Sequence, residues 1–150
     1  MNAKKIIIVV VVLAAAGAGI YGWNEFNRKN QDLSDVKAVH SLQATALISE
    51  FNANDSSANA KYLGKVVAVE GMVKNIDKDE EGKYTVVLGD TADMSAVRCS
   101  MDSVYAANAT SLQRGESVKV KGVFTGFKKD ETGLLGSDVE MNRCVIEKNK

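Results

Sequence analysis

The sequence predicts a mainly β domain, a five-stranded barrel with a helix between strands three and four, preceded by a short N-terminal helix and an apolar anchor helix. Apolar and polar residues alternate in five segments after Gly64, which is the period of a strand that buries one face. Two of these segments contain an interior glycine, Gly71 and Gly122, and barrel strands need glycine where they bend. A stretch of helical periodicity separates the third segment from the fourth and completes the pattern of a small barrel.

The first element is the uncharged run of residues 6–23, which as a helix would extend about 27 Å and approach the ~30 Å hydrocarbon thickness of a bilayer. Lys4 and Lys5 precede this run, as in the basic region of a signal peptide. Tyr21 and Trp23 lie at its far end, where interfacial aromatic residues are expected. We therefore expect residues 6–23 to hold the chain in a membrane, with the N-terminus inside and the remainder outside.

A cleaved signal peptide is the alternative interpretation of residues 1–23. Residues 6–13 have the length of a signal-peptide apolar core, and the small residues 14–18 that follow suit a processing site. Arg28 and Lys29 lie beyond the run and nearly balance the two preceding lysines, so positive charge contributes little to the orientation. Retention of the run gives a membrane-bound domain, and cleavage gives a secreted one.

Residues 24–40 are polar and weakly patterned, which is typical of a stalk between an anchor and a domain. His40 ends this stalk, and we expect its side chain to be exposed to solvent. The domain then spans residues 41–150 and begins with a short helix that Ser41 caps, with Leu47 and Phe51 on its apolar face. Residues 52–59 end that helix, and a further helical turn near residues 60–63 stops at Gly64.

The predicted strands follow, and they are residues 67–73, 84–88, 97–101, 118–124 and 139–146. Residues 77–82 form the first turn, and residues 128–138 form a long polar loop between the last two strands. Asp102 or Ser103 caps a helix that runs to about Gln113 and ends at Gly115. This order of elements is that of an OB-fold, and an open α+β sheet is the alternative that the pattern leaves.

Five short segments of the predicted domain carry a further signal. They are Asn59-Ala60-Lys61-Tyr62-Leu63-Gly64-Lys65-Val66, Val69-Glu70-Gly71, Val97-Arg98-Cys99-Ser100, Gly115-Glu116-Ser117-Val118-Lys119-Val120-Lys121-Gly122, and Cys144. Together they resemble the tRNA-anticodon-binding-like OB-fold family, and the resemblance covers roughly residues 40–147. Its most specific part is the first of these segments.

Members of this family are small bacterial proteins that commonly carry an N-terminal membrane anchor or a lipoprotein signal. The resemblance therefore implies an OB-fold and an envelope location. With the anchor, it implies a single-pass protein of the bacterial inner membrane whose domain lies in the periplasm, or a secreted periplasmic form after cleavage. The family has no established activity, and the nucleic-acid part of its name describes similarity of fold, so the resemblance implies no binding residues here.

Charge and residue types exclude several classes of function. The chain has nineteen basic and nineteen acidic residues, and after Lys4 and Lys5 the remainder has seventeen against nineteen. A surface that binds phosphate would instead show a basic excess. The cysteine and histidine residues are Cys99, Cys144 and His40, which are too few for a tetrahedral metal site or an activated nucleophile. We therefore expect no enzyme, no metal and no cofactor.

Cys99 and Cys144 form a candidate disulfide, because the third and fifth strands of an OB-fold meet and the periplasm is oxidising. The bridge would close a loop of about forty-five residues, and such a loop is worth about 4 kcal/mol in the chain-entropy model. The alternative is that both residues are small buried hydrophobic side chains.

The remaining chemistry is that of a binding surface. The candidate face combines cations with aromatic rings and consists of Lys65, Lys74, Tyr84, Lys119, Lys121 and Phe127. Interspersed Glu70, Asp77 and Glu116 weaken any field that would attract phosphate. The sequence thus predicts a non-enzymatic binding or scaffolding module for a protein, peptide or glycan, with single-stranded nucleic acid as the alternative. Fold analogy places the contact on the barrel face between strands two and three and on loops 76–83 and 127–138.

Overall fold

The computed structural model describes residues 3–26 and 32–147, so Arg28 and Lys29 lie outside the described residues. The chain divides into two compact units, Met1–Gln31 and Asp32–Lys150, and each is treated by itself.

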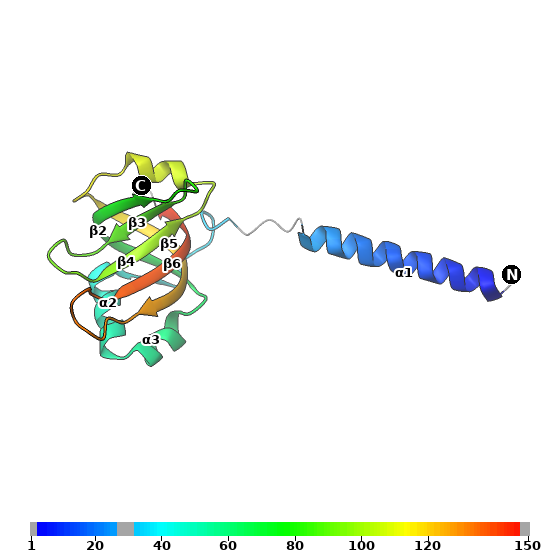
Figure 1. Cartoon of the computed structure of the whole chain (residues 1–150), viewed down its shortest axis with the longest axis horizontal. Helices are drawn as coiled ribbons and strands as arrows, with labels where there is room; N and C mark the ends of the chain where they lie inside the picture. The colour runs from blue at the N-terminus through cyan, green and yellow to red at the C-terminus, as the bar shows by residue number, and fades with distance from the viewer. Residues whose placement is uncertain (1–2, 27–31, 148–150) are drawn as a thin grey trace. The chain divides into compact units, whose positions relative to one another are not determined.

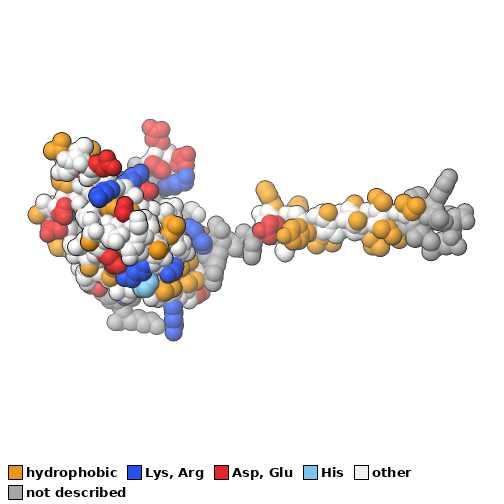
Figure 2. All heavy atoms as spheres, turned by 90° about the horizontal axis from the view of Figure 1, so that it is seen from below, with side chains coloured by type: hydrophobic (Ala, Val, Ile, Leu, Met, Phe, Trp, Pro, Cys, Tyr) orange, Lys and Arg blue, Asp and Glu red, His pale blue; other side chains and the backbone are white. Residues whose placement is uncertain are grey.

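The first unit contains one helix, α1 (Ala3–Phe26). Its segment Val9–Phe26 has a mean hydropathy of 1.4 and is long and apolar enough to cross a membrane, a test that a signal sequence would also pass. Apolar side chains such as Leu13, Ile20 and Trp23 are exposed on it. Figure 2 shows apolar side chains along the coloured part of this helix. Such a helix buries its apolar surface only when another apolar phase covers it.

The second unit is the predicted barrel (Figure 1). Its strands are β1 (His40–Gln43), β2 (Val66–Lys78), β3 (Tyr84–Leu88), β4 (Ala96–Met101), β5 (Ser117–Lys128) and β6 (Asp138–Glu147). The strand order is β1-β2-β3-β4-β6-β5, and pairing of β2 with β5 closes the sheet. Five strands, β2 to β6, therefore form the OB-fold barrel, and β1 is an additional strand parallel to β2.

The two interior glycines lie at close approaches inside this barrel. A Cβ atom on Gly122 would come within 2.5 Å of Cys144 Sγ on β6. A Cβ atom on Gly71 would come within 2.9 Å of the Cβ atom of Ala44. Both glycines thus let the long strands β5 and β2 pass close to a neighbouring element.

Two helices cover the barrel next to β1, namely α2 (Ala44–Ala53) and α3 (Asp55–Tyr62). Phe51 of α2 is fully buried, and its ring stacks on Phe124 of β5 with the ring centroids 4.9 Å apart. The Tyr62 hydroxyl donates a hydrogen bond to Glu50 Oε2 at 2.7 Å, which joins α3 to α2. Asn54 separates the helices, and its side-chain oxygen accepts from the Ser57 backbone N–H at 3.0 Å as the N-cap of α3.

The structure differs from the sequence prediction at the start of the domain. His40 and Ser41 belong to β1, where they pair with Val67 and Ala68 of β2, so Ser41 does not cap the helix. The His40 side chain is half-buried rather than exposed, and its ring meets the edge of Tyr62 at a centroid distance of 5.1 Å. Backbone pairing with β2, which no local pattern encodes, explains the difference.

The helix predicted over residues 102–113 is also shorter than expected. The structure has a 3₁₀-helix, η1 (Ala106–Ser111), between β4 and β5. Ala109 is its one buried residue, and the Thr110 and Ser111 hydroxyls donate to backbone carbonyls three residues earlier. A segment with so little apolar surface has no packing to stabilise a longer helix.

Candidate functional site

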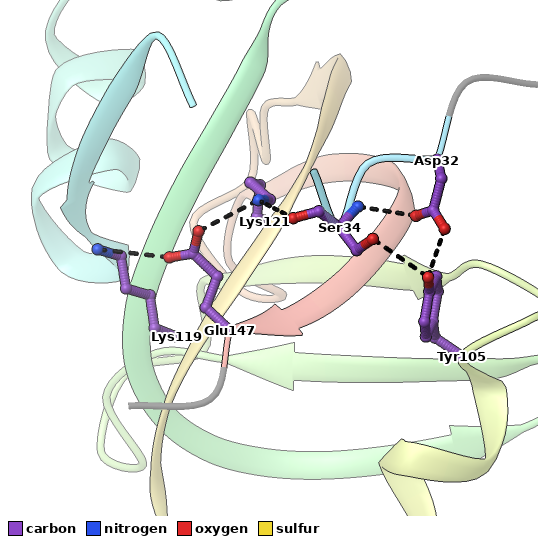
Figure 3. Close-up of polar contacts among 6 residues, drawn as sticks. All are labelled: Asp32, Ser34, Tyr105, Lys119, Lys121 and Glu147. Carbon is purple, nitrogen blue, oxygen red and sulfur yellow. Dashed lines mark hydrogen bonds and ion pairs between the residues drawn. The ribbon is translucent and has the colours of Figure 1, made fainter. Parts of the chain in front are cut away.

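A buried lysine on the outside of β5 is the centre of a polar cluster (Figure 3). Core residues Val118 and Val120 face inward on β5, so Lys119 and Lys121 face outward. The Lys121 side chain is only 7% exposed, and its Nζ atom donates to the Ser34 carbonyl at 3.1 Å. Glu147 lies between the two lysines, 3.3 Å from Lys121 Nζ and 3.5 Å from Lys119 Nζ. The buried Lys121 ammonium thus has an ion pair with Glu147 and a hydrogen bond to the Ser34 carbonyl, which together offset the cost of its burial.

The partner of this cluster is residues 32–39, named here the docked segment. The Tyr105 hydroxyl donates to Asp32 Oδ2 and lies 3.2 Å from Ser34 Oγ, while Leu33 is buried. The hydrogen bond from Tyr105 holds the pKa of Asp32 below its ordinary value, and the same carboxylate raises the pKa of Tyr105. The Val39 backbone N–H then donates to the Val66 carbonyl at 2.8 Å. The domain side of the predicted stalk therefore packs on the barrel.

A second polar network covers the outer surface of the strands across the barrel. Val86, Leu88, Val97 and Cys99 belong to the core, so the residues that alternate with them, among them Thr85 and Arg98, face outward. We call the surface formed by Asn75, Asp77, Thr85, Arg98 and Ser100 the β3–β4 face. Asp77 Oδ2 pairs with an Arg98 guanidinium nitrogen at 3.2 Å, and both side chains are partly exposed.

Further charged groups border the β3–β4 face. Arg114 donates to Asn75 Oδ1, and Asn75 in turn donates to Asp77. On β6, Glu140 pairs with Lys128 at 2.6 Å. Burial raises the pKa of Asp138, although nearby Arg98 opposes that shift. The face therefore carries both signs of charge, and Figure 2 shows basic and acidic side chains interspersed over the part of the domain that it displays.

The predicted cations lie in different parts of the domain. Lys65 is exposed just before β2. Lys74 donates to the Asp93 carbonyl and, at 3.0 Å, to the Ser95 carbonyl, so it fastens the loop between β3 and β4. Lys119 and Lys121 meet in the cluster beneath the docked segment. Their role in binding stays a prediction.

The predicted aromatic platforms turn toward the protein. Tyr84 packs against the core, and Lys78 Nζ lies 5.3 Å from the centre of its ring. Phe127 stacks on Phe51 with ring centroids 4.9 Å apart. Both rings are half-buried, and their role as stacking platforms stays a prediction.

Sequence reasoning placed the contact on the barrel face between β3 and β4, but it did not assign Thr85, Arg98 or Ser100 to that surface. The alternation of Val97, Arg98 and Cys99 could have placed Arg98 on the outside, because its neighbours are apolar. The ion pair between Arg98 and Asp77 could not be predicted from the sequence. It depends on β3 lying between β2 and β4 and pairing with both strands.

Cys99 and Cys144 are both free thiols in the sealed interior of the barrel. Cys144 hydrogen-bonds to Cys99, and burial raises the pKa of the Cys144 thiol well above its ordinary value. The two sulfur atoms are thus neighbours, and their oxidation stays a prediction. Among residues 3–26 and 32–147, no group of three or more His, Cys, Asp and Glu side chains is arranged to hold a metal ion.

Comparison with known proteins identifies relatives of this fold. The tRNA_anti-like family model matches residues 1–137. The Klebsiella pneumoniae protein described as a "putative nucleic acid-binding lipoprotein" superposes with a TM-score of 0.55 at 19% identity, over 81% of this chain and 100% of that one. No curated protein matches.

Two aminoacyl-tRNA synthetases show weaker similarity. The asparaginyl-tRNA synthetase of Pyrococcus horikoshii has a TM-score of 0.40 at 21% identity, over 57% of this chain and 20% of the enzyme. That of Entamoeba histolytica has a TM-score of 0.38 at 16% identity, over 55% and 20%. The chain therefore corresponds to about a fifth of either synthetase.

Proposed function

Because the chain belongs to the tRNA_anti-like family, we propose that it is a non-enzymatic binding or scaffolding module held at the bacterial inner membrane by α1, with its barrel in the periplasm. The apolar length of α1 and the description of the Klebsiella protein as a lipoprotein support this location. The binding role rests on the barrel, since members of this fold use the outer surface and loops of their strands to hold ligands.

The position of the docked segment supports the proposal most directly, because it leaves one face of the barrel free for a ligand. It covers the outside of β5 and engages Lys121 there. In the closed order β2-β3-β4-β6-β5, strand β5 is flanked by β2 and β6 and so lies across the barrel from β3 and β4. The β3–β4 face therefore stays open on the side that the chain's own segment does not occupy.

The chemistry of the β3–β4 face favours a protein, peptide or glycan ligand. Arg98 is paired with Asp77, so a phosphate would have to compete with a carboxylate for the guanidinium. Thr85, Ser100 and Asn75 add donors and acceptors that are not charged. A ligand with hydrogen-bonding groups and few charges of one sign suits this surface.

A photo-reactive amino acid placed at Thr85 in the full chain, in the membranes of cells that produce it, tests the proposal. We expect a discrete crosslinked product at Thr85 and none at Thr110, an exposed threonine on η1 that serves as the matched control. Equal products at both positions, or none at Thr85, would contradict a ligand on this face.

Single-stranded nucleic acid is the second candidate, and the description of the Klebsiella protein as nucleic acid-binding is the observation that favours it. Arg98 and Arg114 would then contact phosphates. Fluorescent single-stranded oligonucleotide titrated into the full chain should bind at low salt, weaken steeply with added salt, and lose affinity on Arg98→Ala. The absence of binding at low salt would remove this candidate.

A further inference from the structure

Two loops are joined at one end of the barrel, residues 89–95 between β3 and β4 and residues 129–137 between β5 and β6. The Ala96 backbone N–H donates to the Ser137 carbonyl at 3.1 Å, and the Ser137 N–H donates to Ser95 Oγ at 3.1 Å. Gly136 packs so closely that an added Cβ atom would lie 2.4 Å from the Met94 carbonyl carbon. The loops therefore behave as one unit.

The carboxylate of Asp130 fixes the shape of the second loop. It accepts the backbone N–H groups of Thr132 at 2.9 Å, Leu135 at 2.6 Å and Gly136 at 3.0 Å, and the Thr132 hydroxyl at 2.6 Å. These donors, the Thr132 hydroxyl foremost, lower the pKa of Asp130 strongly. A loop held by its own hydrogen bonds loses little conformational entropy when it binds.

This rigid unit presents apolar side chains to solvent. Leu134 is 74% exposed, Leu135 is 77% exposed, and Met94 on the adjoining loop is 64% exposed. We call these three residues the apolar tip. Large apolar side chains held rigidly in water are characteristic of anchor residues that enter a pocket on a partner.

An acidic hollow adjoins the apolar tip. It has a volume of about 240 Å³ and is lined by Thr45, Ile48, Ser49, Asn52, Asp90 and Asp93. Asp93 precedes Met94 in the chain, so the hollow and the tip share the loop between β3 and β4. A Lys or Arg side chain entering there could lay its methylene groups along Ile48 and bring its charge to the two carboxylates.

We propose that the apolar tip and the acidic hollow form one docking surface for a protein that presents an apolar cleft beside a Lys or Arg side chain. The inference rests on the proposed binding function and names its partner class. Glu131 adds a third exposed carboxylate, while Lys129 and Lys74, whose ammonium contacts the Asp93 carbonyl, oppose it, so the surface has no basic excess that would favour nucleic acid or anionic lipid.

The docking surface is also accessible on the folded domain. Figure 1 shows residues 89–95 and 129–137 on the side of the barrel away from the docked segment. The docked segment therefore leaves the apolar tip uncovered.

The test uses a photo-reactive amino acid at Leu134 in the full chain, in the membranes of producing cells, followed by mass-spectrometric identification of the crosslinked protein. Binding of that protein, once purified, is then measured against the variants. We expect Leu134→Ser combined with Leu135→Ser to weaken binding by about tenfold or more. Asp90→Lys combined with Asp93→Lys should also weaken binding, and the loss of affinity should be larger at low salt than at high salt.

The matched control is Val104→Ser, which removes another exposed apolar side chain, and it should leave the affinity unchanged. Unchanged binding by the leucine variant would overturn the inference. So would a product at Leu134 that contains lipid, nucleic acid or a second copy of the chain. A product at Thr85 without one at Leu134 would overturn this docking surface but leave the proposed function standing. No product at either position would overturn both.

Discussion

Gly122 of β5 and Cys144 of β6 pack so closely inside the barrel that only glycine fits at position 122 without a shift of its neighbours. A methyl group on Gly122 would lie 2.5 Å from Cys144 Sγ and 3.0 Å from the Asn142 carbonyl oxygen. We expect Gly122→Ala to lower the free energy of unfolding by about 1–3 kcal/mol, the usual cost of overpacking, as measured by urea denaturation. Gly126→Ala on the same strand is the control, because its Cβ atom would meet nothing closer than 3.8 Å. Equal losses in both variants would contradict this explanation.

The thiol pair gives a second prediction at the residue scale. If the domain lies in the periplasm, we expect Cys99 and Cys144 to be joined through their Sγ atoms, with two protons and two electrons passing to a disulfide oxidant of that compartment. The bridge should stabilise the fold by about 4 kcal/mol in the chain-entropy model. Alkylation of the unfolded chain with and without reductant, read by mass, checks it. Labelling of both thiols without reductant would exclude the bridge.

The docked segment depends in part on one carboxylate, that of Asp32, which accepts a hydrogen bond from Tyr105. Because docking lowers the pKa of Asp32, its contribution is present above the ordinary pKa of aspartate and is lost as the pH falls through the docked value. We expect Tyr105→Phe to raise the Asp32 pKa toward its ordinary value, as measured by carboxyl NMR titration. Hydrogen exchange at Val36 and Val39 should become faster in the same variant. Lys65→Met, a change at an exposed lysine outside the cluster, should alter neither quantity.

Elements with a clear local pattern were the ones that the sequence predicted well. The bounds predicted for β3 match the structure, and Val86 and Leu88, two of the apolar residues whose alternation predicted it, are buried in the core. β1 was missed, since its four residues form a strand only by pairing with β2. The docked segment was missed for a similar reason, because the hydrogen bond between Lys121 and Ser34 joins residues 87 positions apart.

The candidate site was predicted less completely than the fold. Sequence reasoning identified Lys119 and Lys121 as cations on a strand, which they are, but it could not show that Glu147 and Ser34 engage them. It named Tyr84 and Phe127 as binding rings but could not show that both pack partly against the core, and their role in binding stays a prediction. Side-chain partners that come from distant elements are determined by the closed sheet rather than by spacing along the chain.

For the whole molecule, retention of α1 decides whether the domain is bound to a membrane. We expect the purified chain to keep its N-terminal segment, to have an intact mass near 16.1 kDa, and to stay with membranes after an alkaline carbonate wash. A smaller mass, of a chain that begins within or just after residues 14–18, together with release into the soluble fraction, would instead establish cleavage.

We propose that the molecule binds its partner through the β3–β4 face, on the side opposite the docked segment. The direct measurement is the affinity of the partner captured at Thr85 for the Arg98→Ala and Lys119→Ala variants. The two variants are matched, because Arg98 and Lys119 each form an ion pair and lie on opposite sides of the barrel. We predict that Arg98→Ala weakens binding by about tenfold and that Lys119→Ala leaves it unchanged. A loss confined to Lys119→Ala would place the partner on the β5 side and contradict the proposed function.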